Sequence, residues 1–124
     1  MITKGEYDPY EHAARLGIAV EYHGLRTANG MWIPEERTIL LKRGMRVLLE
    51  RSVLAHELAH AELGHMDDSP AHERQADLLA ARRLIKPERL KEVAASSSDQ
   101  GEWCLALEVT PRILSTYLEH MNVA

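Results

Sequence analysis

The chain has 124 residues, of which 45% are hydrophobic and none is phenylalanine, a composition that favours packed helices over a large β-sandwich. It carries 15 lysines and arginines against 19 aspartates and glutamates, and the formal net charge of −4 argues against nucleic acid or an anionic membrane as the main partner. A single cysteine excludes an internal disulfide, and the sequence has neither a signal-peptide core nor a long apolar run, so we expect a cytoplasmic protein outside the membrane.

The first segment, residues 1–17, is expected to contain a short N-terminal helix. Asp8 is a typical N-cap residue, and Pro9 suits the first helical position because proline lacks an amide hydrogen. Gly17 suits the end of this helix, where the chain often adopts a left-handed conformation.

Residues 18–42 predict a small sheet. Apolar side chains alternate in IAVEY at 18–22, which is the periodicity of a strand. MWI at 31–33 and TILLK at 38–42 then flank the polar turn PEER. Three short strands this close together predict a small antiparallel three-stranded sheet.

Residues 43–87 predict two long helices. The first spans about 43–65 and is apolar on nearly all sides, which is typical of a buried, central helix. The second is expected to start with Ser69 as N-cap and Pro70 as first residue, and to run to about Ile85.

Residues 88–124 predict further helices at the C-terminal side. RLKEVAA at 89–95 is one helical stretch, and EWCLALE at 102–108 and PRILSTYLEHM at 111–121 are two more. The whole chain therefore reads as a single α+β domain over 1–124, in which a small sheet packs on a central helix.

The central helix carries the pentapeptide HELAH, which is His56-Glu57-Leu58-Ala59-His60. Residues four apart on a helix face the same way, so the imidazoles of His56 and His60 can reach one metal ion. Glu57 lies beside them, where a carboxylate can act as general base toward a water molecule. The alternative is that these histidines are satisfied residues of a buried helix face.

A third ligand is expected thirteen residues after His60, at Glu73. Glu73 and Asp77 share a face of the second helix, so Glu73 can bind the ion while Asp77 accepts a hydrogen bond from a ligand histidine. His65, His72 and Asp77 are the other candidates for third ligand. A ligand set completed by HExxHxxGxxH is excluded, because positions 63 and 66 hold leucine and methionine.

Several motifs together resemble the ImmA/IrrE family of intracellular metallopeptidases. A strand follows LG at 16–17, then come a small sheet, LAHELAHAELGH at 54–65, an ExxAD motif from Glu73 to Asp77, and LLAARRLIKP at 78–87. The resemblance implies that His56, His60 and Glu73 hold Zn²⁺, or Mn²⁺ instead, and that Glu57 is the catalytic carboxylate. It also implies a sheet edge that binds an extended peptide by strand addition, and a DNA-binding transcriptional repressor as the protein substrate.

Other features leave alternatives open. A non-catalytic, metal-containing regulator that binds a repressor is the main competing function. Residues 102–121 have the rhythm of a helix-turn-helix, but the second helix carries one arginine and no lysine, which disfavours DNA recognition. Tyr22, His72 and Tyr117 are each chemically able to stabilise an oxyanion, and the sequence does not choose among them. It does not predict the oligomeric state.

Overall fold

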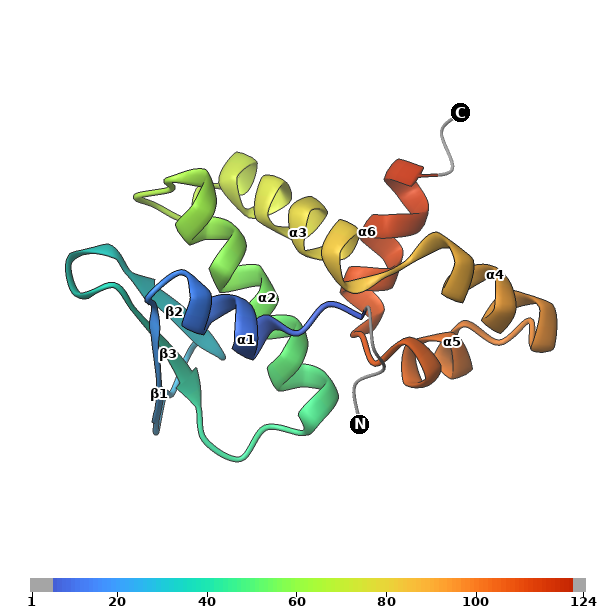
Figure 1. The fold of residues 1–124 in the computed structure, drawn as a ribbon, viewed down its shortest axis with the longest axis horizontal. Helices are drawn as coiled ribbons and strands as arrows, with labels where there is room; N and C mark the ends of the chain where they lie inside the picture. The colour runs from blue at the N-terminus through green and yellow to red at the C-terminus, as the bar shows by residue number, and fades with distance from the viewer. Residues whose placement is uncertain (1–5, 122–124) are drawn as a thin grey trace.

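A computed structural model describes residues 6–121 of the chain (Figure 1). Residues 1–5 of the expected N-terminal segment and 122–124 of the expected C-terminal segment lie outside the described residues. In chain order the described elements are α1 (Pro9–Arg15), β1 (Ala19–His23), β2 (Gly30–Ile33), a 3-10 turn η1 (Pro34–Glu36), β3 (Thr38–Lys42), α2 (Val47–Leu63), α3 (Pro70–Leu84), α4 (Pro87–Ser96), α5 (Gln100–Leu107) and α6 (Pro111–Met121).

The helix starts predicted from Asp8 and Ser69 are present. The Asp8 side chain accepts hydrogen bonds from two amides of the first turn of α1, and the Ser69 side chain accepts one from the amide of His72. The central helix α2 is shorter than predicted. It begins at Val47 rather than near 43, because Gly44 takes a positive φ of 79° in the turn that follows β3.

The sheet is mixed, and the prediction of an antiparallel sheet is wrong in this respect. The strand order is β1-β3-β2; β2 pairs antiparallel with β3, whereas β1 pairs parallel with β3. The connection at 24–29 is long enough to carry the chain past β3, so β1 and β2 end on opposite edges. Periodicity identifies strands but not which strands become neighbours, and only a tight two-residue turn would have required adjacent pairing.

Helix α2 lies between the sheet and the C-terminal helices (Figure 1). On the sheet side, its Leu54 and Leu58 are fully buried against Ile39 and Leu41 of the central strand β3. β3 is the central strand, paired on both sides, and its buried apolar side chains face α2. The predicted α+β architecture, a small sheet packed on a central helix, is confirmed.

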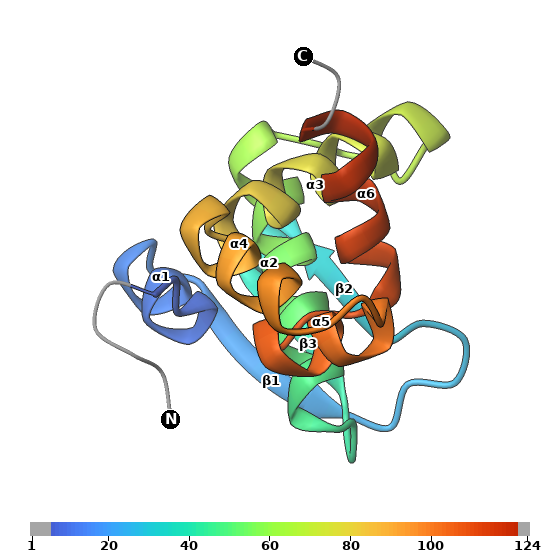
Figure 2. The same ribbon diagram turned by 90° about the vertical axis from the view of Figure 1, so that its right-hand side faces the viewer.

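The C-terminal helices form a second core on the other side of α2. Figure 2 shows α4, α5 and α6 in front of α2. The apolar face of α6, with Ile113, Leu114 and Tyr117, is buried in a cluster that includes Ala80 and Ala81 of α3. The apolar face of α6 is therefore part of the core. Among residues 6–121, none of the helices combines the length and the apolar character that crossing a bilayer requires.

Candidate metal centre

The two histidines of HELAH lie on successive turns of α2 and face the same cavity. Their ring centroids are 4.7 Å apart, and the two Nε2 atoms are 3.1 Å apart. The side chain of His60 is buried and that of His56 is mostly buried. The helical spacing therefore does bring the two imidazoles together, as the sequence leads us to expect.

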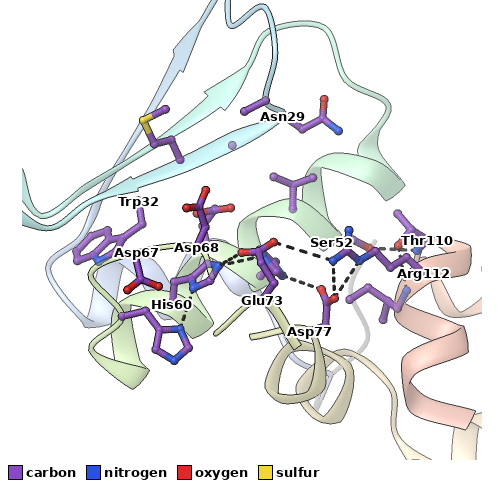
Figure 3. A pocket seen from close by; sticks show the side chains of 18 of the residues that line it. Asn29, Trp32, Ser52, His60, Asp67, Asp68, Glu73, Asp77, Thr110 and Arg112 are labelled. Carbon is purple, nitrogen blue, oxygen red and sulfur yellow. Dashed lines mark hydrogen bonds and ion pairs between the residues drawn. The ribbon is translucent and has the colours of Figure 1, made fainter. Parts of the chain in front are cut away.

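Glu73 reaches the same point from α3. Its Oε1 lies 2.6 Å from Nε2 of His60 and 3.4 Å from Nε2 of His56 (Figure 3). These three residues offer one ligand atom each within 4.8 Å of one another. The cap at Ser69 determines where α3 begins, and so places Glu73 on the first turn, facing α2.

The donor chemistry of this group fits a metal ion. Each ligand imidazole has its Nδ1 atom directed at another side chain, which leaves both Nε2 atoms aimed at the Glu73 carboxylate. Nδ1 of His56 lies 2.8 Å from Oδ1 of Asp77, and Nδ1 of His60 lies 2.9 Å from Nδ1 of His65. Metal-binding histidines are typically held in this way by a partner on the second ring nitrogen.

Asp77 lies where the sequence analysis expects it, next to a candidate ligand, and it also binds an arginine. Burial by itself would raise the pKa of Asp77, but the hydrogen bonds and charges of His56 and Arg112 outweigh burial and hold that pKa below its usual value. Asp77 is therefore a carboxylate, and it accepts a hydrogen bond from His56 on one oxygen.

Glu57 lines the same cavity and is not among the three converging ligands. Burial raises the pKa of its carboxyl group to about 7; the charge of His56 opposes that rise, the charge of Glu73 adds to it, and a backbone hydrogen bond from Trp32 opposes it. A cation bound by the neighbouring ligands would lower this pKa, since positive charge favours the carboxylate. A partly desolvated carboxyl group is suited to accept a proton and to release it again.

Strand β2 passes over this cavity as the open edge of the sheet (Figure 3). The amide of Lys42 donates to the carbonyl of Asn29 at 2.8 Å, so residues 29 and 42 form a hydrogen-bonded pair of the antiparallel ladder. Because such pairs alternate, the backbone groups of Gly30 and Trp32 point away from β3, toward the cavity. The Trp32 amide donates to Glu57, so an extended peptide would pair there with the Gly30 backbone and the Trp32 carbonyl.

The cavity has a volume of about 730 Å³ and extends from the candidate ligands along α2 to the start of α6. Its lining combines the β2 edge with polar groups from the C-terminal half; at that end Ser52, Thr110 and Arg112 contribute (Figure 3). Arg112 Nε is 2.9 Å from Oδ2 of Asp77, and its Nη2 is 4.0 Å from Oε2 of Glu73. Of the arginines and lysines that the structure describes, Arg112 is the one that lines the cavity.

The three proposed oxyanion donors lie elsewhere. Tyr22 donates to Glu50 at the sheet, Tyr117 is buried in the C-terminal core, and His72 stacks on His65. None of these three described side chains lines the cavity.

Sequence reasoning missed the contacts of two neighbours of the site, His65 and Arg112. His65 was one of the alternatives for third ligand, but it contacts His60 instead, and its place directly after Gly64 at a helix end is a signal that it turns back onto α2. Arg112 is 35 residues away from Asp77 in sequence, and nothing local in the sequence connects the two.

A family model described as Peptidase_M78, IrrE N-terminal-like domain, matches residues 13–114, which is 102 of the 124 residues. No curated protein matches the chain.

Proposed function

The chain belongs to the IrrE N-terminal-like peptidase family, and from that premise we propose that it is an intracellular zinc metallopeptidase that cleaves a peptide bond in a regulatory protein. The proposed substrate is a DNA-binding transcriptional repressor. The observation that carries this proposal is the convergence of His56, His60 and Glu73, with the Glu57 carboxyl group beside them under the open edge of β2.

In the proposed mechanism His56, His60 and Glu73 hold the metal ion. Two imidazoles and one carboxylate suit Zn²⁺ in a catalytic site, and Mn²⁺ is the alternative. When bound, the ion supplies Lewis-acid polarisation of the scissile carbonyl and lowers the pKa of water in the site.

The residues of the chain carry out the remaining steps. The backbone of Gly30 and Trp32 binds the substrate as an added strand and aligns its scissile bond with Glu57. Glu57 takes a proton from the attacking water as the C–O bond forms, and it delivers that proton to the leaving nitrogen as the C–N bond breaks. Asp77 and Arg112 hold His56 and Glu73 in place.

The metal site is tested by measuring the zinc content of the purified chain and of two variants, His60→Ala and Glu73→Ala. We expect about one zinc per chain in wild type, and little in either variant, because each loses one of three protein ligands. Glu88→Ala, which removes an exposed glutamate of α4, is the matched control and should bind zinc like wild type. Full zinc content in Glu73→Ala would assign the third ligand to another residue.

The catalytic role is tested by Glu57→Gln, which keeps the size of the side chain but removes the base. Mass spectrometry of protein N-termini in bacterial cells that express the wild-type chain should reveal new N-termini in a DNA-binding regulator. These should be absent from cells that express Glu57→Gln. If instead both forms inactivate the same regulator without producing new N-termini, the chain acts by binding, as a metal-containing regulator.

A further inference from the structure

The C-terminal end of α2 turns back on itself immediately after the candidate ligands. Gly64 has a φ of 71°, the left-handed conformation that glycine adopts without strain. Its amide donates to the carbonyl of Ala61 at 3.3 Å, and the amide of His65 donates to the carbonyl of His60 at 3.0 Å. This pair of bonds is the Schellman motif, in which the residue after glycine packs against the residue five positions before it.

The two residues that this motif brings together are both histidines. The contact at this place in the motif is commonly apolar; here it is a hydrogen bond, with 2.9 Å between Nδ1 of His60 and Nδ1 of His65. On its far side, Nε2 of His65 lies 2.9 Å from Oε1 of Gln75 in α3. The ring of His72 stacks on His65 at 3.9 Å, with an interplanar angle of 8°.

The positions of the protons follow from these contacts. An imidazole that binds a metal through Nε2 carries its hydrogen on Nδ1. The Nδ1–H of His60 then donates to His65, which must accept with its own Nδ1 and therefore carries its hydrogen on Nε2. The Nε2–H of His65 in turn donates to Oε1 of Gln75. Each donor in this series of hydrogen bonds therefore meets an acceptor.

We propose that His65 is a positioning residue for the metal site: it is the acceptor that keeps His60 in its metal-binding tautomer, and Gln75 keeps His65 in the tautomer that accepts. The two ligand histidines are thus oriented by different groups, His56 by the carboxylate of Asp77 and His60 by a ring nitrogen of His65. This inference rests on the proposed metal site, and it adds a residue that acts on the ion through His60.

The test compares the Zn²⁺ affinity of wild type, His65→Leu and His65→Asn by competition with a chromophoric chelator. Leucine supplies the apolar contact usual at this position but no acceptor, so the helix end should still form while zinc affinity falls about 10- to 100-fold. Asparagine places an oxygen where Nδ1 of His65 lies, so it should restore most of the affinity. His23→Leu, which removes an exposed histidine of β1, is the control and should bind zinc like wild type.

Thermal unfolding of each variant in excess chelator separates loss of zinc affinity from loss of folding. The ring nitrogens of the zinc-loaded chain, observed by ¹⁵N NMR, should show hydrogen on Nδ1 of His60 and on Nε2 of His65. Wild-type zinc affinity in His65→Leu, equal losses in the leucine and asparagine variants, or hydrogen on Nδ1 of His65 would each overturn the inference alone. A wild-type chain that binds no zinc would overturn the proposed function as well.

Discussion

Asp77 contacts both His56, a candidate metal ligand, and the guanidinium group of Arg112 in the C-terminal helix α6. One of its oxygens lies 2.8 Å from Nδ1 of His56, and the other lies 2.8 Å from Nη2 of Arg112. The Asp77 side chain is almost fully buried, whereas that of Arg112 is 66% exposed. At the scale of single residues, therefore, the orientation of His56 depends on a carboxylate that has both oxygens occupied.

Asp77→Asn is expected to weaken zinc binding about 10- to 100-fold with little change in shape. The amide can accept from His56 with its oxygen, but its NH₂ group then faces the guanidinium of Arg112, donor against donor. Zinc affinity measured by chelator competition would show the loss. Glu92→Gln removes the same negative charge from α4, far from the site, and should leave the affinity unchanged; equal effects of the two substitutions would contradict a specific role for Asp77.

His12 makes a pH-dependent contribution to stability. Burial lowers the pKa of its imidazole; the nearby carboxylate of Glu62 opposes this shift, and the charge of Arg83 adds to it. Because the folded state favours the neutral ring, the unfolded chain binds a proton at higher pH than the folded chain does. The stabilisation is present above about pH 6.5, the ordinary pKa of histidine, and is lost as the pH falls below it.

His12→Gln should therefore reduce the dependence of stability on pH. Between about pH 7.5 and 5.5, wild type should lose more of its free energy of unfolding than the variant does. Urea unfolding at a series of pH values, in excess chelator so that no metal contributes, measures this difference. If the free energy of unfolding of wild type and of His12→Gln changed equally with pH, His12 would have the same pKa in the folded and unfolded states, and this prediction would be wrong.

At the scale of elements, the distance between β2 and α2 depends on one glycine. A Cβ at Gly30 would lie 2.6 Å from Cγ1 of Val53 and 3.2 Å from Cγ of Glu57. A side chain fits there only if the Val53 side chain, the strand or the helix moves, so Gly30 permits the edge strand to lie directly over Glu57, the proposed general base.

Gly30→Ala is thus expected to destabilise the fold by about 1–3 kcal/mol through overpacking. It should also reduce peptidase activity, because the strand that aligns the substrate is pushed away from Glu57. Gly24→Ala is the control, since a Cβ at Gly24 meets nothing within 4 Å and no positive φ is involved. Chemical unfolding of both variants measures the difference, and equal stability would contradict this close packing.

At the scale of the whole molecule, the candidate metal site lies on helices that also share the C-terminal core, while its central helix α2 packs on the sheet as well. Leu54 and Leu58 of α2 belong to the cluster on the sheet side, and Ala55 belongs to the cluster of the C-terminal helices. The ligands come from α2 and α3, and Arg112 of α6 contacts Asp77 beside them. A bound ion would therefore stabilise the relative position of three helices.

Removal of zinc with a chelator should lower the melting temperature by several degrees. A ligand that binds only the folded state at about 100 times its Kd contributes roughly 2.7 kcal/mol. Differential scanning fluorimetry with and without chelator measures this shift. His60→Ala should show almost no shift; a comparable shift in that variant would mean that the chelator acts on another site.

Much of the fold follows from local signals in the sequence. The caps at Asp8 and Ser69 are short-range hydrogen bonds, so residue types a few positions apart predict where α1 and α3 begin. The strand order is not local: the loop at 24–29 is long enough to allow adjacent or separated strands, and packing on α2 decides between them. The positions of the strands could therefore be predicted from the sequence. The prediction that all three pair antiparallel was wrong, because β1 pairs parallel with β3.

The candidate site, too, has features that follow from local sequence signals and features that depend on the tertiary structure. The sequence alone determined that His56 and His60 face one direction and that Glu73 and Asp77 share a face of the next helix, because helical spacing decides both. Only the tertiary structure placed Arg112 on Asp77 and buried Arg51 against the carbonyl groups of Tyr7 and Glu108. Contacts between residues so distant in sequence depend on how the helices pack around α2, and no residue spacing along the chain encodes that packing.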